Sequence, residues 1–203
     1  MQVIQKDQIT GLLLAGGRGT RMGQVDKGLQ SFRKQPLALH VLQKLSMQTA
    51  SILINANQNL DIYRSFGYTV WPDLLPDFAG PLAGIHTGMH HCQTPYLLCA
   101  PCDSPLLPDN LAEELSSALI KEASDIAVVT TMENVAGTPT RQNHPVFALM
   151  KISLLANLDN FLAAGERKMQ DWYARLKLSE VVFEDHTAFR NINTLKELRE
   201  LEN

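Results

Sequence analysis

Short runs of apolar residues recur along the chain, and the segments between them have apolar positions at helical spacing. Most of the short runs are continuously apolar instead of alternating with polar residues, which is typical of strands covered on both faces. The pattern therefore predicts a mostly parallel central sheet. The predicted strands are Ile9–Leu14, Ser51–Asn55, Thr69–Trp71, Tyr96–Ala100, Ile126–Thr131, Pro145–Met150 and Val181–Phe183.

The segment Pro36–Gln48 shows helical spacing most clearly, because its leucines and its valine fall on one stripe and proline suits a first turn. The same criteria predict helices over Asn59–Phe66, Pro81–His91, Pro108–Lys121 and Ser153–Ala164. Alternation of strands and helices predicts an α/β sandwich with right-handed crossovers. The segment Glu133–Asn143 is rich in Gly, Thr, Pro and Asn and is predicted to be a long mobile loop.

The composition fits one compact domain spanning residues 1–203, with 45% hydrophobic and 19% charged residues. The net charge of -3 and the lack of a Lys/Arg run argue against a nucleic-acid or anionic-membrane partner. An apolar stretch of the roughly 20 residues that a membrane span needs is absent from the sequence. The three cysteines, Cys92, Cys99 and Cys102, fit reduced thiols better than a disulfide framework, so we expect a cytoplasmic protein.

A glycine-rich loop directly follows the first predicted strand, which is where an open α/β sheet binds its ligands. Backbone N–H groups at Gly16 and Gly17 can approach a phosphate chain, and Arg21 and Lys27 can neutralise its charge. The glycine spacing matches neither a P-loop nor a dinucleotide fingerprint, so P-loop ATPase and hydride-transfer functions are not predicted. A glycine-rich turn that binds nothing stays open at this point.

The loop and its surroundings resemble a known signature. Leu14-Ala15-Gly16-Gly17, Arg21-Met22-Gly23 and Val25-Asp26-Lys27-Gly28 resemble the motifs of the Rossmann-like nucleotidyltransferases, and of the molybdenum cofactor guanylyltransferases in particular. Further matches follow in the same order and span nearly the whole chain: Asn55, Asp73, Gly80–Gly84, Cys102-Asp103, His144–Val146 and Asn191–Thr194. The resemblance implies a Rossmann-like three-layer sandwich of the nucleotide-diphospho-sugar transferase type.

The implied reaction transfers GMP from GTP to the phosphate of molybdopterin and releases pyrophosphate. The resemblance implies that Lys27 and Asp103 bind GTP and that Asp103 also holds Mg²⁺, and the candidate catalytic residues are Arg21, Lys27 and Asp103. A carboxylate at the end of a strand suits this hard ion, and the two cations suit the charge of the departing pyrophosphate. The implied nucleotide-binding residues are Leu14, Ala15, Gly16, Gly17, Lys27, Asn55, Asp73, Gly84 and Asp103.

The N-terminal half is expected to bind the nucleotide and the C-terminal half the acceptor. The candidates for acceptor binding are Arg167, Lys168, Asn191 and Asn193, because the acceptor phosphate needs a second anion site beside the first. Thr194 and Glu197 have the spacing of a helix capping box, which is a structural alternative to a functional role of this segment.

Other functions remain open. They are cytidylyl transfer to the same cofactor, nucleotidyl transfer to a sugar or polyol phosphate, and a binding protein that holds GTP or the pterin without catalysis. We expect a monomer, and molybdoenzyme maturation proteins are candidate partners.

Cys99 and Cys102 are predicted to be packing residues, not a redox pair. His86 and His90 are four apart on a predicted helix, but no further ligand motif accompanies them, so zinc is not predicted there.

Overall fold

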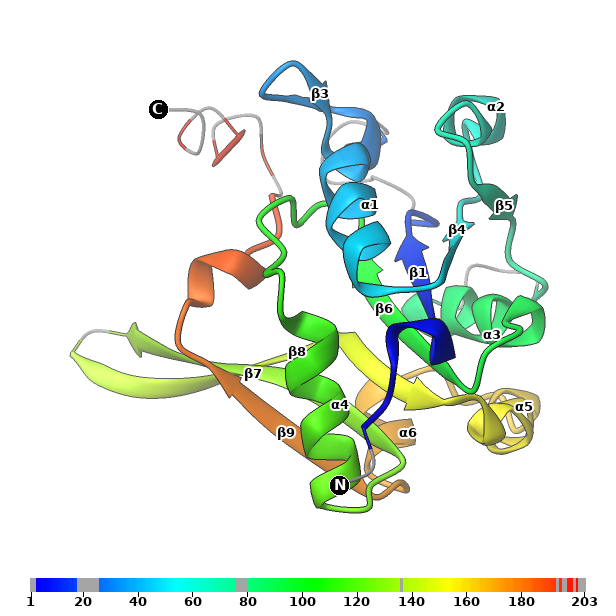
Figure 1. The fold of residues 1–203 in the computed structure, drawn as a ribbon, viewed down its shortest axis with the longest axis vertical. Coiled ribbons are helices and arrows are strands. Elements are labelled where there is room, and N and C mark those ends of the chain that lie inside the picture. Colours follow the sequence, from blue (N-terminus) through cyan, green and yellow to red (C-terminus); the bar gives the residue numbers. More distant parts are fainter. Residues whose placement is uncertain are drawn as a thin grey trace.

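A computed structural model describes residues 3–17, 26–75, 80–135, 137–192, 194, 197, 198 and 200. Its centre is a seven-stranded sheet with the order β5-β4-β1-β6-β8-β7-β9, and β2 pairs with β3 in a small hairpin (Figure 1). The strands are β1 Ile9–Leu14, β2 Ser31–Phe32, β3 Gln35–Pro36, β4 Ser51–Asn55, β5 Thr69–Trp71, β6 Tyr96–Pro101, β7 Ile126–Val135, β8 Thr138–Lys151 and β9 Leu178–Phe183. All seven predicted strands are therefore present.

The register of the parallel strands determines which residues meet at one edge of the sheet. Strands β5, β4, β1 and β6 are parallel neighbours, and Leu14 lies beside Asn55 on one side and Pro101 on the other. Strand β8 runs antiparallel to β6 and β7, while β7 and β9 are parallel. The predicted mostly parallel sheet is confirmed, and the carboxyl ends of β1, β4 and β6 lie together.

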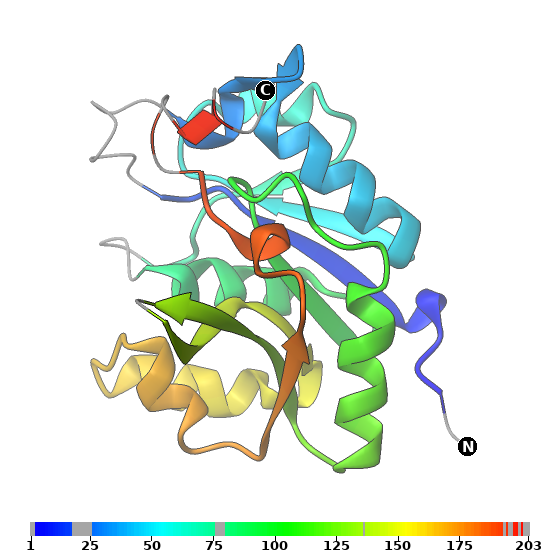
Figure 2. The same cartoon turned by 90° about the vertical axis from the view of Figure 1, so that its left-hand side faces the viewer.

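Helices cover both faces of the sheet, which gives three layers (Figure 2). They are α1 Leu37–Gln48, α2 Leu60–Arg64, α3 Pro81–His91, α4 Leu111–Lys121, α5 Leu155–Ala163 and α6 Met169–Tyr173. The helices α1 and α4 share one apolar core with Leu13, whereas α3, α5 and α6 share the other with Leu12. Successive residues of β1 thus point to opposite faces, as the continuous apolar pattern requires. In the described ranges, no helix is long and apolar enough to cross a membrane.

The prediction of a mobile loop over Glu133–Asn143 was wrong. Strands β7 and β8 continue through this segment as a paired hairpin, with Glu133 beside Thr140 and Gly137 at a φ of +85°. The hairpin projects from the body of the molecule (Figure 1), and residues 137–143 are exposed, so the segment carries no buried apolar positions that would identify strands. The hairpin β2–β3 and helix α6 were not predicted, because both are too short to show a period.

Candidate active site

A cavity of about 500 Å³ opens at the carboxyl edge of β1, β4 and β6. This volume lies within the range of small-molecule binding sites. Every predicted nucleotide-binding residue except Gly84 lines the cavity, although these residues come from distant parts of the chain. The lining residues are Leu14, Ala15, Gly16, Gly17, Asp26, Lys27, Asn55, Asp73, Gly80, Pro81, Pro101, Cys102, Asp103, Val146 and Asn191.

The glycines at the cavity serve different purposes. A Cβ added at Gly17 would meet nothing within 4 Å, so this residue leaves open space. A Cβ at Gly16 would come within 2.9 Å of the Asn55 side-chain oxygen. Gly84 lies away from the cavity in helix α3, where a Cβ would come within 2.4 Å of Asn55 Oδ1 and 2.5 Å of Leu14 Cδ2. Gly84 therefore permits close packing of α3 on the sheet and does not itself leave room for a ligand.

Asn55 and Asp73 belong to one hydrogen-bonded network on the wall of the cavity. Buried Asn55 donates its Nδ2 to Asp73 Oδ1 at 2.8 Å. Asn57 donates to the other carboxylate oxygen of Asp73 at 2.8 Å and to the carbonyl of Gly16 at 3.1 Å. The network fixes the Asp73 carboxylate and ties it to the glycine loop. Asn57 was missed in the sequence because an Asn in a loop after a strand is an ordinary turn residue.

A short 3-10 helix, η3 Lys27–Leu29, places Lys27 at the cavity. Asp26 caps it by accepting a hydrogen bond from the backbone N–H of Gly28 at 3.1 Å, and Tyr63 donates its hydroxyl to the same carboxylate at 2.8 Å. A Cβ at Gly28 would lie 2.4 Å from the Tyr63 oxygen and 3.1 Å from Cys102. Only glycine therefore fits where this turn packs against the sheet.

Asp103 and Lys27 form the charged centre of the cavity. The Lys27 Nζ lies 3.5 Å from Asp103 Oδ2, and these side chains are 21% and 11% exposed. Burial raises the pKa of the Asp103 carboxyl, while the neighbouring Lys27 ammonium opposes this shift. A buried carboxylate with its charge only partly compensated favours a further cation beside it. The donor set of one carboxylate at a cavity of small-molecule size suits Mg²⁺, which binds through one or two carboxylates and substrate phosphates.

The C-terminal segment closes one side of the cavity. Ile192 donates its backbone N–H to the Asp103 carbonyl at 2.9 Å, and Ser104 donates its hydroxyl to Asn191 Oδ1 at 2.9 Å. A second cavity of about 490 Å³ adjoins the first, because both are lined by Val146 and Asn191. Its other lining residues are Glu133, Gln142, Asn143, His144, Pro145, Phe147, Phe189, Arg190 and Glu197.

Two of the predicted acceptor residues lie elsewhere. Arg167 and Lys168 are exposed and outside both cavities, and Arg167 donates to the backbone carbonyls of Leu162 and Glu166 at 2.7 Å each. Arg21 and Asn193 lie outside the described residues.

Two structural predictions are confirmed. Thr194 and Glu197 exchange the two hydrogen bonds of a capping box, at 3.2 and 3.1 Å. Cys99 and Cys102 are buried free thiols, and burial raises the pKa of both, as packing residues require.

The fold and the cavity define the class of protein. A mostly parallel sheet with a glycine loop, a lysine and a buried carboxylate at one edge is the architecture of a nucleotidyltransferase of the nucleotide-diphospho-sugar transferase type. Residues 11–181 match the model of the MobA-like NTP transferase domain, and the chain belongs to this family.

Relatives of similar length support this membership. The chain is 54% identical over 200 residues to the molybdenum cofactor guanylyltransferase of Ralstonia nicotianae, with 98% of each chain covered. It is 48% identical over 199 residues to the enzyme of the same name from Bordetella petrii, covering 98% of this chain and all (100%) of the relative.

Solved structures share the fold at low sequence identity. Molybdopterin-guanine dinucleotide biosynthesis protein A from Archaeoglobus fulgidus matches with a TM-score of 0.73 and 21% identity, covering 95% of this chain and 96% of that one. The 4-diphosphocytidyl-2C-methyl-D-erythritol synthase of Anaerococcus prevotii matches with a TM-score of 0.74 and 12% identity, with 98% of each chain covered.

Proposed function

We propose that the chain transfers GMP from GTP to the phosphate of molybdopterin, releasing pyrophosphate and forming the guanine dinucleotide form of the molybdenum cofactor. The observation that carries this proposal is the cavity that joins the glycine loop, Lys27 and Asp103 at one edge of the sheet. Relatives of about the same length that are about half identical bear the name of this activity.

The proposed nucleotide site uses the walls of the first cavity. The glycine loop from Leu14 to Gly17 lies where its N–H groups can approach the phosphates, and Asn55 and Asp73 offer an amide and a carboxylate to the ribose or base. Asp103 would hold Mg²⁺, which would neutralise phosphate charge when bound. Lys27 stands beside Asp103, where it can stabilise the negative charge on the leaving pyrophosphate.

The proposed chemistry is a direct displacement. A phosphate oxygen of the acceptor attacks the α-phosphorus of GTP, a new P–O bond forms, and the bond to the β-phosphate breaks with its electrons leaving on pyrophosphate. Positioning and charge neutralisation supply most of the rate, since the enzyme need not form a covalent intermediate. Arg21 is proposed as a second cation for the triphosphate.

The second cavity is the proposed acceptor site. It adjoins the first through Val146 and Asn191, so an acceptor phosphate there can reach the α-phosphorus of the nucleotide. Arg190 supplies a cation to this cavity, and the half-buried ring of His144, which rests on the buried Phe189, offers a flat surface to a pterin. An acceptor bound there would lie in the C-terminal half, as proposed from chain order, with Glu197 of the capping box at its border.

The proposed setting of the enzyme is the cytoplasm, with GTP and molybdopterin as its small-molecule partners and the monomer as the active form. Buried reduced thiols and a net charge of -3 agree with an enzyme that binds neither nucleic acid nor an anionic membrane.

One assay tests the proposed function directly. Pyrophosphate release is measured with each of the four nucleoside triphosphates and Mg²⁺, with and without molybdopterin. Release that needs both GTP and molybdopterin is expected. Release only with CTP identifies a cytidylyltransferase, release with a sugar phosphate in place of molybdopterin identifies a different acceptor, and GTP binding without release under all conditions identifies a binding protein.

A further inference from the structure

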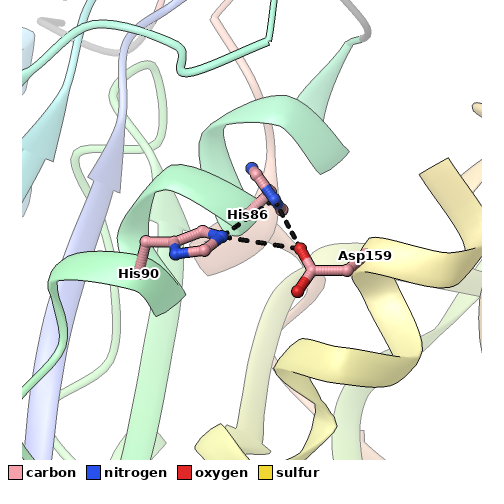
Figure 3. A group of neighbouring side chains, drawn as sticks. All are labelled: His86, His90 and Asp159. Carbon is pink, nitrogen blue, oxygen red and sulfur yellow. Dashed lines mark hydrogen bonds and ion pairs between the residues drawn. The ribbon is translucent and has the colours of Figure 1, made fainter. Parts of the chain in front are cut away.

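Three potential metal ligands meet between helices α3 and α5, outside the nucleotide cavity. Figure 3 shows the imidazoles of His86 and His90, one turn apart on α3, pointing toward the carboxylate of Asp159 on α5. His86 Nε2 lies 2.8 Å and His90 Nε2 3.5 Å from Asp159 Oδ1, and the two Nε2 atoms are 3.1 Å apart. Asp159 follows His86 by 73 residues, so the sequence did not associate the three.

Protons alone satisfy this arrangement poorly. If only His86 Nε2 is protonated, the lone pair of His90 Nε2 faces the carboxylate oxygen. If only His90 Nε2 is protonated, the lone pair of His86 Nε2 faces that oxygen at 2.8 Å. If both are protonated, two N–H groups face each other across 3.1 Å. The first state keeps its two facing acceptor atoms 3.5 Å apart and the other two bring like groups closer, whereas a cation between the three atoms would attract all of them.

The separations fit a metal ion held by two imidazoles and a carboxylate. Metal–ligand distances of about 2.0–2.2 Å at a tetrahedral angle place neighbouring ligand atoms about 3.3–3.6 Å apart. The three observed separations are 2.8, 3.1 and 3.5 Å. The longest separation already fits such a site, and a metal could enter once the two shorter ones open by a few tenths of an ångström, to about 3.3 Å.

We propose that His86, His90 and Asp159 form a Zn²⁺ site that joins α3 to α5. Two imidazole nitrogens and one carboxylate oxygen suit Zn²⁺ and similar transition metals, whereas Mg²⁺ prefers oxygen ligands alone. The His90 and Asp159 side chains are 38% and 44% exposed, so the site opens to solvent and water would complete the coordination. His86, at 8% exposed, anchors it from the inside.

The site braces the helix that borders the nucleotide cavity. Helix α3 begins at Gly80 and Pro81, which line that cavity, and its second turn packs on Asn55 through Gly84. Among the described residues, the buried His86 Nδ1 has no hydrogen-bond partner. Loss of such an outer hydrogen bond weakens metal sites about 10–100-fold, so we expect weaker binding than in a closed structural zinc site.

Calorimetry on the full, tag-free chain tests the site, after treatment with a chelator and in a background of Mg²⁺. We expect one Zn²⁺ per chain to bind at this site. His90→Ala and Asp159→Asn should each weaken it by at least ~10-fold, because each removes one of three ligands. At a Zn²⁺ concentration 100 times the dissociation constant, the melting temperature of the wild type should rise by about 5–10 °C. Co²⁺ in the site should give visible d–d absorption that both variants lose.

The matched control is His186→Ala, which removes an exposed histidine from another part of the chain. This variant should bind Zn²⁺ like the wild type. His90→Ala retains the His86–Asp159 contact, and Asp159→Asn retains an oxygen acceptor for His86, so circular dichroism is expected to show folded chains for both. Absence of Zn²⁺ binding by the wild type overturns the proposal, and so does wild-type affinity in both variants, which would place the ion elsewhere, for example on thiols.

Discussion

Asp103 combines burial, one neighbouring cation and a position at the end of β6. We predict that Asp103→Asn keeps the fold but lowers turnover by ~100-fold or more, which is the usual effect of removing a preorganised electrostatic contact to reacting phosphates. Pyrophosphate release at saturating Mg²⁺ measures the effect. Turnover near that of the wild type would show that Asp103 does not bind the catalytic metal.

The same residue gives a separate prediction about stability. Because burial raises the pKa of Asp103 in the folded chain, the carboxyl favours folding while it is protonated, and this contribution is lost as the pH rises through the folded pKa. Without Mg²⁺, Asp103→Asn should therefore melt at or above the wild-type temperature at neutral pH, with a smaller difference in acid. Thermal melts across pH check this, and a variant that melts well below the wild type at neutral pH contradicts it.

Lys27 stands 3.5 Å from Asp103, at a point where a phosphate chain would need a positive charge. We predict that Lys27→Ala weakens GTP binding by about 1.5–3 kcal/mol, the usual contribution of a charge-assisted hydrogen bond. Calorimetry with GTP measures the change, and Lys121→Ala, at an exposed helix end, is the control. If affinity and turnover both match the wild type, Lys27 is an ordinary surface lysine.

At the scale of elements, the close approach of α3 to the sheet depends on Gly84. Alanine there gains about 1 kcal/mol of helix propensity, but overpacking costs about 1–3 kcal/mol. The added Cβ would lie 2.4 Å from an Asn55 oxygen whose side chain is itself held by Asp73, so the clash is not relieved by a simple rotation. We predict a net loss of up to about 2 kcal/mol in the free energy of unfolding.

Denaturant titration measures this loss. Gly17→Ala is the matched control for stability, because its Cβ would meet nothing within 4 Å and should leave the unfolding free energy unchanged. Equal stability of Gly84→Ala and the wild type would show that α3 can shift outward without cost.

The acceptor elements give a further prediction. Arg190→Ala should weaken molybdopterin binding by roughly 10-fold or more and leave GTP binding unchanged, because Arg190 lines the second cavity and not the first. The contact of Arg167 and Lys168 with the acceptor phosphate stays a prediction from chain order. If a double alanine variant of Arg167 and Lys168 binds both substrates with wild-type affinity, the predicted contact of that pair with the acceptor is wrong. If Arg190→Ala binds molybdopterin with unchanged affinity, the acceptor does not bind in the second cavity.

The pattern of apolar residues predicted helices and strands well where burial determines which residue types occur. Strands β1, β4 and β5 begin and end where predicted; β1 and β4 are internal and mostly buried, whereas β5 is a short edge strand. All the predicted helices are present in the structure. Helix α4, however, begins at Leu111 instead of Pro108, because the preceding residues form an irregular turn. The projecting hairpin of β7 and β8 could not be predicted, because exposed strands held by backbone hydrogen bonds need no apolar pattern.

At the scale of the whole molecule, the sequence order of site residues says little about their contacts. Lys27 and Asp103 lie 76 residues apart, and Ser104 and Asn191 lie 87 apart, yet each pair is in contact. The resemblance to a known family predicted eight of the residues that line the first cavity as nucleotide-binding, but not how they are arranged. It did not indicate Asn57, nor the meeting of His86 and His90 with Asp159, since these depend on how the layers pack.

The base preference is a property of the whole cavity, because the fold alone does not determine it. The solved structures that share this fold include a synthase whose name refers to a cytidyl product. In this chain Gly16 and Gly17 line the first cavity, and the open space at Gly17 gives a purine more room than a pyrimidine needs. Gly84, by contrast, contributes only through the position of α3.

We predict a preference for GTP over CTP of at least ~100-fold in kcat/KM. Guanine offers donors at N1 and N2 and an acceptor at O6, and a site that pairs with these groups leaves its own polar groups unmet when cytosine binds. Initial rates of pyrophosphate release with molybdopterin and each nucleotide give the ratio. ATP is the control for ring size, since it is a purine with a different hydrogen-bonding edge and should be rejected as well. Equal or better use of CTP overturns the guanylyl assignment and leaves the nucleotidyltransferase class intact, whereas equal use of ATP and GTP would show that the cavity selects purines by size alone.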